Sequence, residues 1–268
     1  MMKINELLKL LAFPSEIILP LQATPHGLNN EQFDYFSNKM RKPSEYENNA
    51  NELAKALEPD PKGHKMLNTL LEIACKTHND YKEKGVCDDI FIQTMKCLLR
   101  FTLEHKESYG EYGFNRAFWV GRQLSMKLFR IGELEYEMVE LEGKNAISIH
   151  IPSDASLTDE KVDFSLLKAK EFFAAYYPTY HGVTYFCSSW LLSPVLKNML
   201  PPASKILKFA NRFTITKYDE SAEDYKIWVY KNNQLKPEDF PENTSLQRNL
   251  KKHVLSGGKV GEAFGVLI

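Results

Sequence analysis

Apolar positions in the first part of the chain recur at three- and four-residue steps, which is the period of an α-helix. This period runs from Met66 to Ala74 and again from Ile90 to Thr102, and it predicts two long helices. Residues 4–11 have the pattern of a short amphipathic helix, and Pro14 allows a second helix to begin near Ser15. The first part of the chain is therefore expected to be entirely helical.

Glycine and proline positions predict where these helices end. Residues 57–63 hold two prolines and a glycine and are expected to form a loop. Gly85 is expected to end the first long helix, and Asp88 and Asp89 are candidate N-cap residues of the next. The pattern over residues 20–47 predicts no definite element.

The period changes to two near residue 130, and this predicts a β-hairpin. Apolar residues alternate with glutamates over residues 133–138, the pattern of a strand with one solvent-facing side. The glutamates are Glu133, Glu135 and Glu137. After a turn at 142–145, residues 146–151 carry isoleucines on one side and Ser148 and His150 on the other.

The rest of the chain mixes helices and strands. Helices are expected over 116–128, 165–177 and 194–199, and strands over 183–190, 212–218, 225–230 and 263–268. Thr244 and Gln247 have the spacing of a capping box, which predicts a helix from there to Gly257. The fold class is therefore α+β, with an all-helical N-terminal domain over residues 1–125 and a mixed α/β domain over residues 126–268.

Composition and charge exclude several classes of protein. Of 268 residues, 43% are hydrophobic and 26% are charged, so a disordered chain is not expected. The 34 Lys and Arg nearly balance the 35 Asp and Glu, so no nucleic-acid partner is expected. No apolar run approaches the roughly 20 residues that span a bilayer, and the N-terminus does not have the pattern of a signal peptide. We expect a soluble, cytoplasmic protein with no membrane partner.

The cysteines and histidines predict no metal site. Cys75, Cys87, Cys97 and Cys187 have neither CxxC spacing nor a regular spacing, which argues against a disulfide framework and a zinc knuckle. Buried thiols are expected instead.

Several segments are similar to one known family. They are Phe118-Trp119, Arg122-Gln123, Phe129 to Leu134, His150-Ile151-Pro152, Cys187 to Leu192, and Thr244 to Arg248. The chain resembles the bacterial acyltransferase domain-containing proteins, which pair a helical N-acyltransferase N-terminal domain with a GNAT-like C-terminal domain. The resemblance covers nearly the whole chain from about Gly85 onward. It implies a GNAT-like α+β fold and acyl transfer from a thioester such as acyl-CoA, which would then be a co-substrate.

One expected feature of GNAT enzymes is missing from the sequence. Those enzymes hold the CoA pyrophosphate on a glycine-containing loop at a helix N-terminus. The connection that matches it best here, residues 152–160, has no glycine and carries Asp154, Asp159 and Glu160. The sequence therefore does not predict CoA binding in the usual mode.

His150 and Ser188 are the candidate catalytic residues. Acyl transfer to an amine needs a base, and His150 stands at the end of a predicted strand opposite the isoleucines. The alternative is that His150 only holds the turn that follows it. Ser188 shares a strand face with Trp190, from which its hydroxyl could line a cleft. A nucleophilic Cys187 paired with His150 or His181 is a further alternative, without a local signature in its favour.

Five residues from the similar segments are candidate substrate-binding residues: Arg122, Gln123, Trp190, Gln247 and Arg248. An arginine at position 122 could clamp a carboxylate substrate or tie two domains together. Trp190 could equally belong to the core, and the basic residues near Arg248 could bind an anion or form the solvated side of a helix.

Two functions follow as hypotheses. The first is an N-acyltransferase that moves an acyl group from an acyl-CoA-type thioester to an amine. The second is a non-catalytic GNAT-like module that binds a small molecule or a partner. The expected partner is a small-molecule substrate, and the sequence does not determine the oligomeric state.

Overall fold

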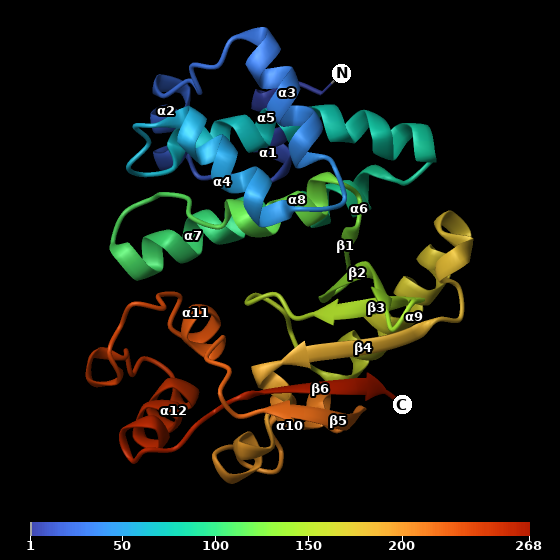
Figure 1. Ribbon diagram of the computed structural model, residues 1–268, viewed down its shortest axis with the longest axis vertical. Coiled ribbons are helices and arrows are strands. Elements are labelled where there is room, and N and C mark those ends of the chain that lie inside the picture. The colour runs from blue at the N-terminus through green and yellow to red at the C-terminus, as the bar shows by residue number, and fades with distance from the viewer. Residues whose placement is uncertain (1) are drawn as a thin grey trace. The chain divides into compact units, whose positions relative to one another are not determined.

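The computed structural model describes residues 2–268, which divide into two compact units (Figure 1). The first unit ends at Arg130, and the second runs from Ile131 to Ile268.

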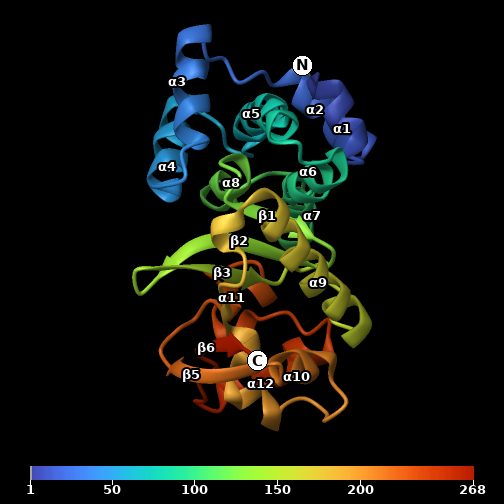
Figure 2. The ribbon, with the colours of Figure 1, turned by 90° about the vertical axis from the view of Figure 1, so that its right-hand side faces the viewer.

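The first unit is helical, as its sequence predicts. Its helices are α1 (Ile4–Leu10), α2 (Ser15–Ala23), α3 (Asn30–Met40), α4 (Tyr46–Leu57), α5 (His64–Lys84), α6 (Asp88–Met95), α7 (Cys97–Tyr109) and α8 (Ala117–Leu124). The long helix α5 is at the centre, packed against α1 to α4, α6 and α8. Figure 2 shows it between the pair α3 and α4 and the pair α1 and α2. Gly85 ends α5 in the left-handed conformation, as predicted.

Three details of this unit differ from the sequence-based expectation. The helix expected over 90–102 is interrupted at Lys96, which separates α6 from α7. Cys87 is the N-cap of α6, so Asp88 and Asp89 lie in its first turn. The helix expected to run to residue 128 ends at Leu124 because Met126 has a φ of 55°, a left-handed conformation that terminates helices.

The second unit is built on a sheet with the strand order β1-β2-β3-β4-β6-β5. The strands are β1 (Leu128–Ile131), which spans the boundary between the units, and β2 (Leu134–Leu141), β3 (Lys144–His150), β4 (Thr184–Ser189), β5 (Phe213–Asp219) and β6 (Glu262–Leu267). The helices are α9 (Asp159–Tyr176), α10 (Lys205–Ala210), α11 (Tyr225–Val229) and α12 (Ser245–Leu255), with short 3-10 turns η1 (Pro178–Tyr180), η2 (Trp190–Leu192), η3 (Pro194–Asn198) and η4 (Pro237–Asp239). The predicted hairpin is confirmed as β2 and β3, and the α+β fold class with it.

The two central strands of this sheet are paired over only three residues each. β3 and β4 run parallel, and their pairing ends at Ser148 and Phe186. On its outer side β3 stays paired with β2 up to His150, and β4 stays paired with β6 up to Ser189. The sheet is therefore two antiparallel halves, joined by a short parallel ladder, whose inner strands part toward their carboxyl ends.

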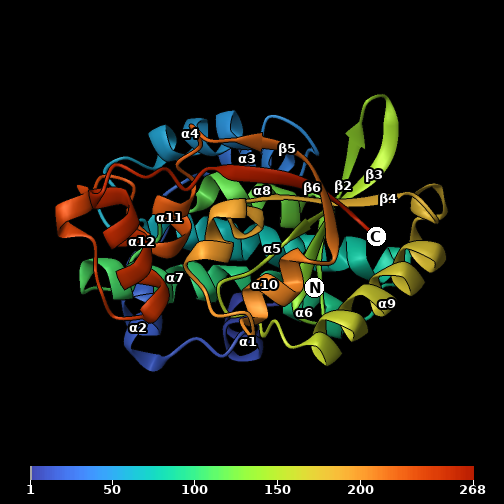
Figure 3. The same ribbon diagram turned by 90° about the horizontal axis from the view of Figure 1, so that it is seen from below.

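Helix α9 covers one face of the sheet. It begins at Asp159, earlier than the predicted residue 165, and Figure 3 shows it on the same side of β4 and β6 as α10. Ser165 fixes it to the sheet: its fully buried hydroxyl donates to the Ile131 carbonyl at 2.5 Å and accepts from the Leu134 N–H at 3.2 Å. The Tyr136 hydroxyl lies 2.8 Å from the same oxygen. Gly132 permits this approach, since a Cβ there would lie 3.1 Å from Ser165 Cβ.

A second apolar cluster packs beneath α12. It is formed by the buried residues Trp190, Leu191, Leu196, Leu207, Tyr225, Tyr230, Phe240, Leu250 and Val260. The predicted capping box of Thr244 and Gln247 is confirmed at the start of α12. The strand expected over 225–230 is wrong: Tyr225 begins the short helix α11, because burial of its aromatic residues in this cluster overrides their strand propensity.

We predict that Ser165→Ala lowers the free energy of unfolding by about 1–3 kcal/mol, because three buried polar groups then lose their shared partner. Chemical denaturation followed by circular dichroism measures this. The control is Lys168→Ala, an exposed residue of α9 that should change stability by less than about 0.5 kcal/mol. Equal stability of Ser165→Ala and the wild type would contradict the anchoring role.

Candidate functional site

Polar side chains gather on the face of the sheet opposite α9. The strand register places Ser148 beside Glu137 on β2 and beside Phe186 on β4, so these residues share one face. Two residues further along, His150 on β3 and Ser188 on β4 lie on that same face, beyond the last paired residues. The structure therefore brings the two predicted catalytic residues to the same face, on opposite sides of the place where the strands part.

His150 is held by a carboxylate. Its Nε2 lies 2.9 Å from Glu137 Oε2, with the imidazole and the carboxylate both largely buried. In the neutral imidazole this contact makes Nε2 the protonated nitrogen and Nδ1 the basic one. An orienting carboxylate of this kind is a common partner of a histidine that acts as a base.

The glutamate stripe on β2 is not solvent-facing, contrary to the sequence-based expectation. Glu135 is only 2% exposed, and Glu137 is held against His150. Glu133 accepts a hydrogen bond from the Ser156 N–H at 2.7 Å and pairs with Lys161 at 2.8 Å. The alternation correctly predicts that Glu135 and Glu137 share a face of β2, whereas Glu133 directly precedes the strand. β2 lies inside the sheet between β1 and β3, so this face is not open to solvent along the strand.

Ser188 is paired with Glu262, which the sequence reasoning missed. The exposed Ser188 hydroxyl donates to Glu262 Oε1 at 2.5 Å. Burial raises the pKa of Glu262, and the nearby carboxylates of Asp224 and Asp219 raise it further, whereas the hydrogen bond from Ser188 lowers it. In the sequence, Glu262 directly precedes the predicted last strand. This position at a strand end was the only feature of the sequence that could have indicated Glu262 as a site residue.

The two candidate residues on α8 have different environments. The Arg122 guanidinium lies 4.9 Å from the ring of Tyr46 and 4.4 Å from the ring of Trp119, and it donates to the Phe118 carbonyl. Gln123 is fully buried, and its amide can donate to the carbonyls of Trp119 and Val120. The Gln123 side chain is therefore used in hydrogen bonds to the backbone of its own helix.

The three candidates near the C-terminus have structural contacts. Trp190 is buried in the cluster beneath α12. Gln247 is buried, completes the capping box and donates to the Val229 carbonyl at 3.3 Å. Arg248 is exposed and donates to the Glu242 carbonyl at 2.8 Å. Of these three, only Arg248 has a solvent-facing charged group.

The cysteines are free thiols, and the structure does not favour Cys187 as a nucleophile. Cys187 is fully buried on the α9 side of β4, and burial raises the pKa of its thiol, which disfavours the reactive thiolate. Cys75 and Cys97 are buried as expected, but Cys87, the N-cap residue of α6, is exposed, so the expectation of a buried thiol is wrong there. Within residues 2–268 no group of three or more metal-ligating side chains is brought together. None of the described helices has the length and apolarity to cross a membrane.

Comparison with known families accounts for both units. Residues 2–126 match the N-acyltransferase N-terminal domain, and residues 128–267 match the GNAT-like C-terminal domain. The chain belongs to this acyltransferase family. No curated protein sequence matches it significantly.

Solved acyltransferase structures share the fold of this family member. One is an acyltransferase in complex with CoA and 10C-teicoplanin, 21% identical, with a TM-score of 0.79 over 98% of this chain and 86% of that chain. A mutant acyltransferase in complex with octanoyl-CoA is 20% identical, with a TM-score of 0.80 over the same shares. A third, in complex with decanoyl-CoA and teicoplanin, is 19% identical, with a TM-score of 0.70 over 99% of both chains.

The connection between β3 and α9 differs from a phosphate-binding loop in this GNAT-like domain. The Ser156 N–H is already bound to the Glu133 carboxylate. At the start of α9, Asp159 pairs with Arg212 at 3.0 Å, and that hydrogen bond lowers the pKa of the Asp159 carboxyl. Carboxylates of the chain thus take up partners that would otherwise suit a phosphate.

We predict that iodoacetamide modifies Cys87 in the native protein and leaves Cys187 unmodified, because only Cys87 is exposed. Peptide mass spectrometry after brief labelling measures this. In denaturant both residues should react, which serves as the control. Rapid native modification of Cys187 would contradict its assignment as a buried thiol and restore the Cys–His alternative.

Proposed function

We propose that the protein is an N-acyltransferase that moves an acyl group from an acyl-CoA-type thioester to an amine. The observation that carries this proposal is the parting of β3 and β4, which sets His150 and Ser188 on one face at the open end. Backbone groups of Ile149 and of residues 187–189 extend past the ladder there. An acyl-thioester donor whose chain contains amide groups can lie between the two strands and form hydrogen bonds with these backbone groups.

Each of the two side-chain pairs has a role in the proposed reaction. The amine nitrogen attacks the thioester carbonyl, and His150 Nδ1 takes the proton that the nitrogen loses. When the carbon–sulfur bond breaks, the thiolate takes a proton from the Ser188 hydroxyl, which regains one from Glu262. The raised pKa of Glu262 supports this transfer, because it increases the fraction of the carboxyl that holds a proton.

The charge of the site supports an amine as the acceptor. Glu135 and Glu137 lie on the same face as His150, and Glu137 contacts its ring. Carboxylates attract a protonated amine, and the histidine can then accept its proton. The four free thiols support the reducing environment of the cytoplasm as the place of this reaction.

We predict that His150→Gln lowers the rate of acyl transfer about a hundredfold or more, because it removes the base. The assay measures thiol release from octanoyl-CoA in the presence of a panel of primary amines, with the acylated product identified by mass spectrometry. Ser188→Ala should lower the rate by at least about tenfold.

His253→Gln is the matched control for the histidine change, because His253 is a half-buried residue of α12 whose imidazole contacts the Lys259 carbonyl at 3.0 Å. It should keep the wild-type rate. Acylation that proceeds at the wild-type rate in His150→Gln would rule out the proposed base, whatever the acceptor.

One observation favours a second function, a module that binds a small molecule without catalysis. Glu133 holds the Ser156 N–H and Lys161, both of which a pyrophosphate would otherwise attract. In this reading CoA binds weakly or not at all.

We predict that Glu133→Gln tightens CoA binding about three- to tenfold, because it removes a repulsive charge and releases Lys161. Isothermal titration calorimetry with CoA measures this for both proteins. Glu171→Gln is the control, since Glu171 pairs with the exposed Lys168 on α9. If neither wild type nor Glu133→Gln binds CoA, the binding-module function is favoured over the transferase.

A further inference from the structure

Helix α12 stands at the end of the sheet where β3 and β4 part. Trp190, which directly follows β4, belongs to the cluster beneath α12, and Ile151, which directly follows β3, packs against it. Leu246 and Val254 of α12 pack against the same cluster. Figure 1 shows α12 at the end of the sheet toward which the arrows of β3 and β4 point. A donor arm that leaves the parted strands at this end therefore emerges beside α12.

The side of α12 that faces away from the cluster is basic. Arg248, Lys252 and Leu255 follow one another at four- and three-residue steps, so they share one side of the helix, and all three are exposed. The helix contains no aspartate or glutamate. Leu255 is 52% exposed, so an apolar group accompanies the two positive charges. This basic face of α12 suits an acidic surface that also has apolar groups.

No ion pair within residues 2–268 takes up the charges of the basic face. Arg248 donates to the backbone carbonyl of Glu242, which is uncharged, and Lys252 pairs with no carboxylate. The β3–α9 connection differs, because Lys161 there is paired with Glu133. The basic face therefore offers an anionic partner two charges that no carboxylate of the chain already holds.

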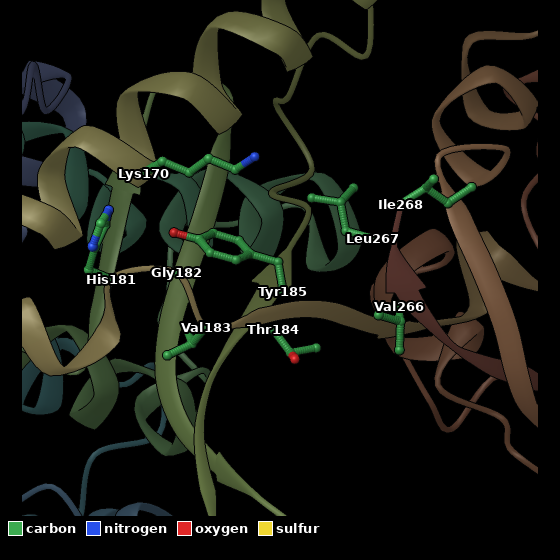
Figure 4. Close-up of a pocket in the computed structure, with 9 residues that line it drawn as sticks. All are labelled: Lys170, His181, Gly182, Val183, Thr184, Tyr185, Val266, Leu267 and Ile268. Carbon is green, nitrogen blue, oxygen red and sulfur yellow. The ribbon is translucent and has the colours of Figure 1, made fainter.

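The position of the basic face favours a protein over a nucleotide as its partner. A helix is about 10 Å across with its side chains, so the thickness of α12 separates Arg248 and Lys252 from the parted strands. The cavity of about 390 Å³ in Figure 4 lies at the other end of β4, against Thr184 and Val266. Groups free to bind an anion near the parted strands thus lie on the outer surface, where a folded partner reaches them.

We propose, on the basis of the acyl transfer proposed above, that the thioester donor is a carrier protein whose acyl group is attached to a phosphopantetheine arm. An acidic helix of the carrier docks on Arg248, Lys252 and Leu255. The arm contains amide groups and enters between β3 and β4. In the transfer the carbon–sulfur bond of the arm breaks and a carbon–nitrogen bond to the amine forms. The arm keeps its sulfur as a thiol, with the protons moving as described above.

The test compares three octanoyl thioesters as donors for the full chain with the same panel of amines. They are an acidic acyl carrier protein that bears the octanoyl arm, octanoyl-CoA, and octanoyl-pantetheine, which has neither protein nor phosphate. The carrier thioester should give a kcat/KM at least about tenfold above that of octanoyl-CoA. Calorimetric binding of the non-acylated carrier should weaken at least about fivefold between about 0.05 M and about 0.5 M NaCl.

Charge reversal on α12 makes the test specific. Arg248→Glu combined with Lys252→Glu should lower kcat/KM for the carrier thioester at least about tenfold more than for octanoyl-pantetheine, because only the carrier contacts α12. Lys252→Glu alone should do so about threefold, and it remains informative if the double variant does not fold, because Lys252 is exposed. The matched control is Lys168→Glu on the exposed side of α9, which should leave kcat/KM unchanged with both donors.

A kcat/KM for octanoyl-CoA equal to or above that for the carrier thioester would overturn the proposal. So would a double variant that loses as much with octanoyl-CoA as with the carrier, which would assign the basic face to the CoA phosphates instead. Carrier binding that the double variant weakens, without transfer from any of the three donors, would support the docking surface and contradict the proposed acyl transfer.

Discussion

The short parallel ladder between β3 and β4 is the constraint on which the candidate site depends. Pairing stops at Ser148 and Phe186, although both strands continue with their outer partners to His150 and Ser189. Because those outer partners satisfy one side of each strand, the parting leaves ladder positions open only between the two strands. In the proposed function a ligand that carries amide groups takes those positions, and the proposed catalytic side chains of His150 and Ser188 project from the strands on either side of it.

Separate packing elements hold the two halves of the sheet. The Ser165 hydroxyl fixes α9 to the turn between β1 and β2, on the half that carries His150 and Glu137. The other half is held by the cluster beneath α12 and by the stacked rings of Phe186 and Phe264, whose centroids lie 4.8 Å apart. This half carries Ser188 and Glu262. The proposed base His150 and the proposed proton donor Ser188 therefore belong to different packing units, and the three-residue ladder sets their relative position.

The sequence predicts those parts of the fold whose period or capping residues are local. The hairpin, the central helix of the first unit and the capping box of Thr244 are of this kind. A strand was wrongly predicted at Tyr225 because an aromatic residue that is buried by distant partners has the same local sequence pattern as a strand residue. His150 and Ser188 were proposed from strand alternation and from the family resemblance, and the structure brings them to one face of the sheet. Glu262 was not, because its link to Ser188 spans 74 residues and depends on strand order, which no local pattern contains.

Hydrogen–deuterium exchange with and without octanoyl-CoA tests the central claim most directly. If a thioester donor enters between the parted strands, the amides of residues 149–151 and 187–189 gain protection when the donor is present. Residues 146–148 and 184–186, which the ladder already pairs, change little. Donor-dependent protection confined to other parts of the chain, with residues 149–151 and 187–189 unaffected, would contradict the account.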